Sequence, residues 1–283
     1  MNVDNLRLAK DMKYEALYWA LSFEELEKNT FSKKYNNLIV KINSELGLVD
    51  FNNKLSIVNG DSSHIDYIGY QDAFDGSYNN FMLSRIELAY ELLSNDGFLV
   101  INIDEGEVDN LAKLCKDLFY KVKICKWEKL HPYFDKNRNV NPNKMVVKYE
   151  HIIICFKSKE SKLNNLNQPY LEGDVLKEKE AKVPTIFKCF GTNSSAKDEI
   201  EAIFGDRTYF QTPKPLKLLK ELVRATTNKD STVLDFFAGS GTTGHAVIDL
   251  NKEDAGNRKY ILISNSESNI CKDVTLKRIK MLS

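Results

Sequence analysis

The sequence has no surplus of charge, no paired cysteines and no long apolar run, and each absence excludes a class of protein. Its 40 basic residues equal its 40 acidic ones, so net charge gives no sign of a nucleic-acid partner. Its five cysteines are scattered without a Cys-x-x-Cys pair, which excludes a zinc ribbon or a disulfide scaffold, and we expect no metal. No stretch reaches ~18 apolar residues, and the first residues lack a secretory pattern. We therefore expect a cytoplasmic protein without a membrane partner.

What is present is a core-forming composition with strands and helices in alternation. Hydrophobic residues make up 42% of the 283, enough for a sizeable core. The apolar pattern predicts strands over 55–58, 98–104, 121–127, 150–156, 231–237 and 259–265. It predicts helices over 81–97, 107–119, 215–227, 245–251 and 269–282. This alternation favours an α/β fold with a doubly wound, mostly parallel sheet.

Four segments follow from the same pattern. Apolar residues at helical spacing predict an N-terminal helical segment over 1–50. Residues 51–157 and 206–283 carry the strand–helix alternation. Between them, 158–205 is polar and charged, and we expect an inserted loop region.

A glycine-rich turn between a strand and a helix is the sharpest local feature. Gly239, Gly241 and Gly244 satisfy the spacing G-x-G-x-x-G, which by itself also fits a tight turn without a ligand. These glycines would let the backbone approach a ligand closely. Asp235 precedes them, and its carboxylate would repel a pyrophosphate but could accept hydrogen bonds from a cationic amino group.

Together with its neighbours, this turn resembles a known family. Asp-Phe-Phe-Ala-Gly-Ser-Gly-Thr-Thr (235–243) looks like the S-adenosylmethionine (AdoMet) motif of amino-directed DNA methyltransferases. Gln-Thr-Pro-Lys-Pro (211–215) resembles the segment just upstream of that motif, and Gly-Asn-Arg-Lys-Tyr (256–260) resembles a strand that follows it. The strongest likeness is to the modification (Mod) subunits of type III restriction-modification systems. The resemblance implies that 51–157 is the catalytic half of the methyltransferase domain and that 206–283 is its AdoMet-binding half, so the catalytic half comes first. The resemblance implies an AdoMet-type doubly wound fold.

The resemblance also implies cofactor and partner assignments. Lys214 and Pro215 fall where the family contacts the methionine end of AdoMet, and Glu267 falls where an acidic residue takes the ribose hydroxyls. The cradle between them is implied to consist of Asp235, Phe237, Gly239, Gly241 and Thr242. The implied substrate is double-stranded DNA, methylated at adenine N6 at a specific site. The implied partners are a second copy or a methyltransferase or restriction subunit, and the insert 158–205 is a reduced target-recognition region.

The family's catalytic motif is missing. Methylation of an exocyclic amine needs acceptors for its two N–H bonds and a ring that stacks on the flipped base. The family provides these with Asp-Pro-Pro-Tyr, but no two of the six prolines here are adjacent, and none precedes Pro132. Asp66, Tyr67 and Tyr70 are weak catalytic candidates, since they offer an acid and aromatic rings without a proline-constrained loop.

A local cluster of positive charge interrupts the neutral sequence. Residues 113–148 contain ten basic residues and three acidic ones, interleaved with aromatic residues. Such a stripe suits contacts to DNA phosphates, for which Lys126, Lys129 and Arg138 are candidates. A solvated surface face balanced by acids elsewhere is the alternative.

Three functions are therefore open. The first is an AdoMet-dependent DNA methyltransferase. The second is an inactive AdoMet- or DNA-binding remnant, or a partner subunit whose mate supplies the catalytic loop. The third is a dinucleotide-dependent oxidoreductase, against which Asp235 and the Thr-Pro-Lys-Pro segment argue.

Overall fold

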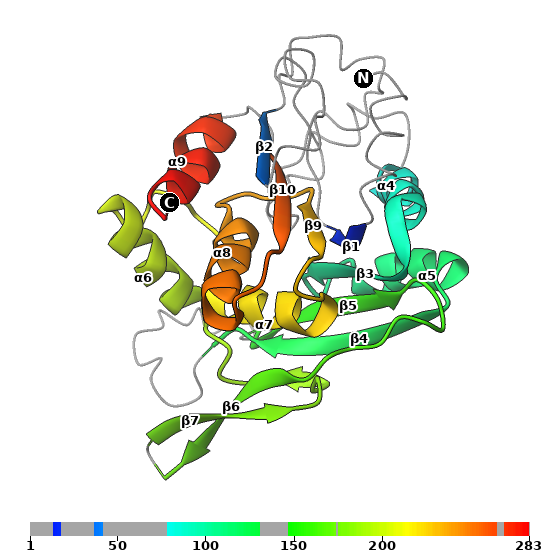
Figure 1. The fold of residues 1–283 in the computed structure, drawn as a ribbon, viewed down its shortest axis with the longest axis horizontal. Coiled ribbons are helices and arrows are strands. Elements are labelled where there is room, and N and C mark those ends of the chain that lie inside the picture. Colours follow the sequence, from blue (N-terminus) through cyan, green and yellow to red (C-terminus); the bar gives the residue numbers. More distant parts are fainter. Residues whose placement is uncertain are drawn as a thin grey trace, which may run out of the picture.

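The computed structural model describes residues 14–17, 37–41, 78–130, 147–173, 175–264 and 269–282. An eight-stranded sheet with the order β2-β10-β9-β1-β3-β5-β4-β8 forms its centre (Figure 1). The strands are β1 (Tyr14–Leu17), β2 (Asn37–Lys41), β3 (Leu93–Ile103), β4 (Lys121–Glu128), β5 (Tyr149–Phe156), β8 (Ile186–Phe187), β9 (Thr232–Asp235) and β10 (Lys259–Ser264). From β2 to β3 all neighbours are parallel, and β5 runs antiparallel to both β3 and β4.

Helices cover both faces of the sheet, as the doubly wound prediction requires. One face packs against α4 (Tyr78–Leu92) and α5 (Val108–Leu118). The other packs against α7 (Leu216–Thr226), α8 (Thr242–Asp254) and α9 (Leu276–Lys280). β5 is buried along almost its whole length because its two faces belong to different core clusters. The predicted fold class is confirmed.

Helix faces follow the apolar spacing. In α5 the buried residues recur every three or four positions, namely Val108, Leu111, Ala112 and Cys115. The same holds for α7, where Leu218, Leu222 and Ala225 enter the core. Residues 269–282, predicted as one helix, form a π-helical turn (Ile270–Thr275) followed by α9.

The helical prediction for 1–50 is wrong at two places. Residues 14–17 form β1, between β9 and β3, and residues 37–41 form β2, at the sheet edge beside β10. Leu38, Ile39 and Val40 pair in parallel with the middle of β10. Helical spacing in a short apolar run is ambiguous, and pairing with the sheet overrides it. The predicted strand at 55–58 lies outside the described residues.

The predicted loop region 158–205 contains regular structure. β6 (Leu166–Glu172) and β7 (Val175–Ala181) form an antiparallel hairpin apart from the main sheet, at the bottom of Figure 1. β7 is exposed on both faces, so it lacks the apolar alternation by which a strand is recognised. Helix α6 (Asn193–Phe204) follows, with Thr192 and Ser195 forming a reciprocal cap.

Candidate functional site

The glycine-rich turn lies at the carboxyl end of β9 and leads directly into α8. The strand ends at Asp235 and the helix begins at Thr242. Gly239 and Gly241 have positive φ angles of 46° and 75°, a conformation that a side chain would strain. The amide of Gly241 donates to the carbonyl of Ala238 at 2.6 Å, which closes the turn.

Both the turn and the helix that follows present backbone N–H groups. The first bond within α8 runs from the amide of His245 to the carbonyl of Gly241, at 3.2 Å. The amides of 242–244 come earlier and have no partner inside the helix. A helix N-terminus also carries partial positive charge, so this end of α8 favours polar, electron-rich ligand groups.

Asp235 is a buried acid, and among the described residues no basic side chain contributes to its pKa shift. Only 3% of its surface is exposed, and its Oδ1 accepts the amide of Phe237 at 3.0 Å. Burial raises the pKa of Asp235 from 3.8 to about 7, and the Thr243 side chain and the Phe237 amide oppose that rise. A carboxyl group in this state gains charge readily when a cation arrives beside it.

The two phenylalanines after Asp235 have different surroundings. Phe236 is buried in the core cluster beneath α4 and α5, and Phe237 is half-buried at its margin. Their rings stack with centroids 5.2 Å apart. The amide of Ala238 donates to the carbonyl of Ile263 in β10, so the turn is fixed to the neighbouring strand.

Lys214 and Pro215 lie at the start of α7. Lys214 Nζ binds Glu150 Oε2 at 2.6 Å and lies 5.7 Å from the ring centroid of Trp127. Pro215 is the N-cap residue of α7 and fits closely against Gly191, where an added Cβ would lie 2.5 Å from the proline Cβ. The predicted cofactor lysine is thus already paired with a buried carboxylate.

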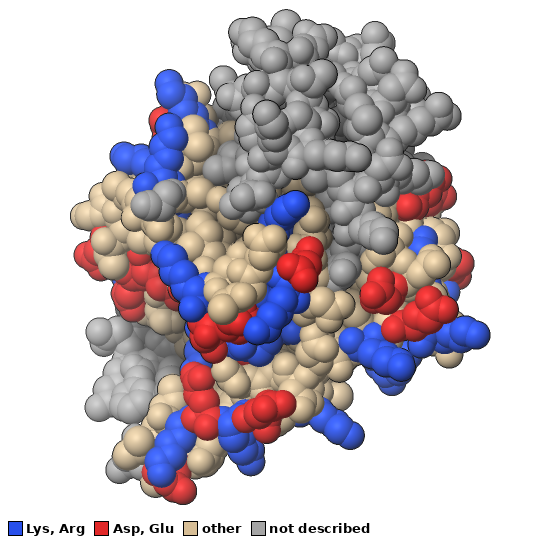
Figure 2. Space-filling model, viewed as in Figure 1, with Lys and Arg blue, Asp and Glu red and all other residues tan. Residues whose placement is uncertain are grey.

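The predicted DNA-contacting lysines come from β4 and the residue after it. Lys126 is exposed, with its ammonium 5.7 Å from the ring centroid of Tyr149. Lys129 Nζ lies 3.3 Å from Glu150 Oε1, so Glu150 is shared between Lys129 and Lys214. On the face drawn in Figure 2, basic and acidic side chains are interspersed.

Five predicted site residues lie outside the described residues: Asp66, Tyr67, Tyr70, Arg138 and Glu267. Residues 235–242 do form one turn. Among the described residues, no group of histidine, cysteine or acidic side chains could hold a metal ion, and no helix is long and apolar enough to cross a membrane.

Sequence reasoning missed two charged residues that the structure places close to the predicted site. Glu150 is 7% exposed and joins the two lysines named above. Arg278 in α9 is completely buried and donates to the hydroxyl of Thr242 at 3.0 Å. Neither residue belongs to a recognisable motif. Each is buried by partners that lie far away in the sequence, so no local pattern reveals it.

A doubly wound sheet with a glycine-rich strand–turn–helix at its carboxyl edge defines a nucleotide-type ligand-binding domain. The model of the N6/N4 DNA methylase family matches residues 31–274. The chain therefore belongs to this DNA methylase family.

Relatives with described roles match smaller parts of the chain. The Mod subunit of the type III restriction-modification enzyme StyLTI of Salmonella typhimurium is 55% identical over 71 residues, which are 25% of this chain and 11% of that protein. The type II methyltransferase M2.MboI of Moraxella bovis is 27% identical over 187 residues, 64% of this chain and 61% of that protein. The chain thus spans a small part of the Mod subunit's length.

Two solved structures match part of the chain at low sequence identity. The M1.HpyAVI–SAM complex has 22% sequence identity and a TM-score of 0.48, covering 72% of this chain and 84% of that chain. The cytosine-N4-specific PvuII DNA methyltransferase has 17% identity and the same TM-score, over 72% of this chain.

Proposed function

We propose that this chain is an AdoMet-dependent DNA methyltransferase of the type III Mod kind, acting in the cytoplasm on adenine N6 in double-stranded DNA. The observation that carries the proposal is the buried Asp235 beside the two left-handed glycines, in a chain of the DNA methylase family. Oxidoreductase chemistry is disfavoured, because a buried carboxylate at this turn repels a dinucleotide's pyrophosphate.

The residues of the turn fit AdoMet. Its methionine end carries cationic groups, and Asp235 is a carboxyl group whose pKa of about 7 would fall beside a cation. Phe237 offers a half-buried ring, and Gly239, Gly241 and Thr242 line the start of α8. When bound, AdoMet supplies the methyl group that is transferred.

Lys214, just before α7, supports the same proposal. Its ammonium group has three donors, of which Glu150 takes one at 2.6 Å. The ion pair restricts the side chain and leaves donors for a carboxylate such as that of the methionine end. Pro215 fixes the backbone that follows, and Glu267 is proposed for the ribose hydroxyls.

Methyl transfer to DNA requires groups that the family supplies from one catalytic motif, and this sequence lacks that motif. The flipped base needs two fixed acceptors and a stacking ring, and the chain has no adjacent prolines to build the Asp-Pro-Pro-Tyr loop. This observation favours a second candidate function, an AdoMet- and DNA-binding chain whose catalytic loop comes from a partner subunit or a second copy.

Calorimetry tests the cofactor assignment. AdoMet and its demethylated product should bind the wild-type protein, and NAD should not. Asp235→Asn should weaken AdoMet binding, since a hydrogen bond to a charged group is typically worth ~1.5–3 kcal/mol. Asp230→Asn, at an exposed position just before β9, is the matched control and should bind as the wild type does. No heat and no thermal shift with AdoMet would contradict the proposal.

Transfer of tritium-labelled methyl groups to mixed-sequence duplex DNA separates the two candidate functions. If the catalytic loop comes from a partner subunit or a second copy, the chain alone should give no incorporation, because losing preorganised acceptors removes several powers of ten in rate. Adding a complete Mod subunit, or inserting an Asp-Pro-Pro-Tyr strand and loop between Ser63 and Asp66, should restore it. Robust incorporation into adenine by the unmodified chain would refute the partner-supplied loop.

A further inference from the structure

A completely buried arginine contacts the end of the glycine-rich turn. Arg278 belongs to α9, and none of its surface is exposed. One of its terminal nitrogens donates to Thr242 Oγ1 at 3.0 Å and to Ser240 Oγ at 3.4 Å. These two hydroxyls also bond to each other at 2.9 Å. The guanidinium thus bonds to Ser240 and Thr242, the residues on either side of Gly241.

The same segment of the chain holds the turn at a second place. Thr275 Oγ1 donates to the carbonyl of Gly239 at 2.6 Å. A Cβ at Gly241 would lie 3.3 Å from the Thr275 carbonyl oxygen, so the two segments pack backbone to backbone. In Figure 1, α9 lies above α8, and the two helices are in contact.

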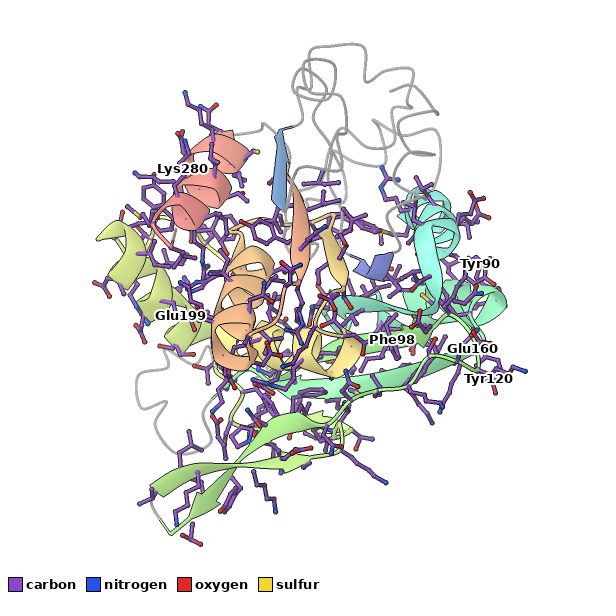
Figure 3. All side chains as sticks on the ribbon, in the orientation of Figure 1. Tyr90, Phe98, Tyr120, Glu160, Glu199 and Lys280 are labelled. Atoms are coloured by element: carbon purple, nitrogen blue, oxygen red, sulfur yellow. The ribbon has the colours of Figure 1, made fainter. Side chains whose placement is uncertain are left out.

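Glu199 in α6 connects Arg278 to the other predicted cofactor segment. Its Oε2 lies 3.6 Å from Arg278, and both carboxylate oxygens accept the amide of Leu216, at 3.0 and 3.1 Å. Leu216 is the first residue of α7, directly after Lys214 and Pro215. Figure 3 labels Glu199 on α6. One carboxylate therefore caps α7 and pairs with the arginine that holds the turn.

His245 completes the surroundings of the arginine. Its Nδ1 accepts from two guanidinium nitrogens of Arg278, at 3.3 and 3.2 Å. Burial and the nearby Arg278 charge lower the pKa of His245 to about 4, opposed by Asp249. The imidazole is therefore neutral near pH 7 and can act as the acceptor that this geometry requires.

We propose that Arg278 is a positioning residue that, together with Glu199, locks the glycine-rich turn and the start of α7 into one arrangement for the cofactor. The planar guanidinium reaches Ser240, Thr242, His245 and Glu199 at once. A lysine ammonium has no such fork, so charge alone cannot replace it. The cofactor part of this inference rests on the proposed function, whereas the locking of the turn does not.

The experiment compares Arg278→Lys and Glu199→Gln with a matched control, Arg258→Lys. Arg258 is also a buried arginine, but it binds Asp254 and Thr227. It directly precedes β10 and so lies at the amino end of that strand, whereas the turn lies at the carboxyl end of β9. Glu199→Gln keeps an acceptor for the α7 cap and removes the charge, so it tests the pair with the smallest change in shape. Native-state hydrogen exchange of the amides of 239–245 and calorimetric affinity for AdoMet are measured for each variant, alongside global stability.

Arg278→Lys should speed exchange of the 239–245 amides about tenfold or more beyond its effect on global stability, and weaken AdoMet binding at least tenfold. Glu199→Gln should act in the same direction, and Arg258→Lys should lower stability while leaving both readouts within about twofold. Equal exchange in the Arg278 and Arg258 variants would overturn the inference. If the wild type binds no AdoMet, the proposed function fails, and the exchange data still decide whether Arg278 positions the turn. If Arg278→Lys does not fold, Glu199→Gln carries the same test.

Discussion

The buried carboxyl group of Asp235 predicts that the ligand-free protein is destabilised at neutral and alkaline pH. The side chain is 3% exposed, and burial raises its pKa from 3.8 to about 7. An acid whose pKa rises on folding binds its proton more tightly in the folded state than in the unfolded one. Its contribution to stability is therefore complete below the unfolded value near 3.8 and is lost as the pH rises through about 7.

The size of the effect follows from the two pKa values. A rise from 3.8 to about 7 corresponds to about 4 kcal/mol, which is an upper bound because the folded chain can relax or admit water around the charge. Asp235→Asn removes the charge and keeps an oxygen that can accept the Phe237 amide. Above about pH 7 the variant should be more stable than the wild type by about 2–4 kcal/mol, and below about pH 4 the two should be nearly equal.

Urea unfolding of both proteins, followed by circular dichroism between about pH 4 and about pH 8.5 without ligand, measures this difference. Other groups titrate over this range, and the comparison of the two proteins cancels them. Asp230→Asn controls for the loss of one negative charge at an exposed position. Saturating AdoMet should stabilise the wild type more than the Asp235 variant at alkaline pH, since it binds the folded state through that charge.

Two results would refute the reasoning. If Asp235→Asn is less stable than the wild type at about pH 8.5, then the carboxylate is stabilised by a partner inside the fold. If the difference between the two proteins does not change with pH, then Asp235 does not titrate in this range. Either result would also remove the electrostatic argument for a cationic ligand at this turn.

Two further predictions concern the neighbouring segments. Gly191→Ala should destabilise the protein by roughly 2–4 kcal/mol in thermal or urea unfolding, because its φ is 93° and an added Cβ would meet a proline ring at 2.5 Å. The control Gly173→Ala, with φ 61° and no atom of the described residues within 4 Å of the added Cβ, should cost only about 1–2 kcal/mol. Equal losses would exclude the close contact as the cause. If the basic cluster contacts phosphates, replacing Lys126, Lys129 and Arg138 together by alanine should reduce the slope of log affinity against log salt for duplex DNA by ~0.9 per lost contact. An unchanged slope would identify the cluster as a solvated face.

The parts of the fold that could be predicted are those with local patterns. The apolar pattern predicts a strand over 150–156, which is found as β5, and a helix over 107–119, which is found as α5. The glycine spacing after Asp235 predicted a tight strand-to-helix turn, and the positive φ angles of Gly239 and Gly241 confirm that conformation. In these cases the residues within one short window determine the local structure.

The parts that could not be predicted depend on distant partners. Residues 14–17 and 37–41 form strands because the sheet offers them unpaired backbone edges, which overrides their weak helical spacing. The hairpin of β6 and β7 has no apolar alternation to reveal it, since both faces of β7 are exposed.

The candidate site divides in the same way. The sequence by itself determined which residues form the turn, because glycine at 239 and 241 and an acid at 235 act through their own backbone and charge. Only the tertiary structure decided that Asp235 is desolvated, that Glu150 joins two lysines, and that Arg278 and Glu199 connect the turn to α7. Desolvation and ion pairing depend on what is packed within a few ångströms. Glu150 reaches Lys214, Glu199 reaches the start of α7 and Arg278 reaches the turn only when the sheet has brought their helices and strands together.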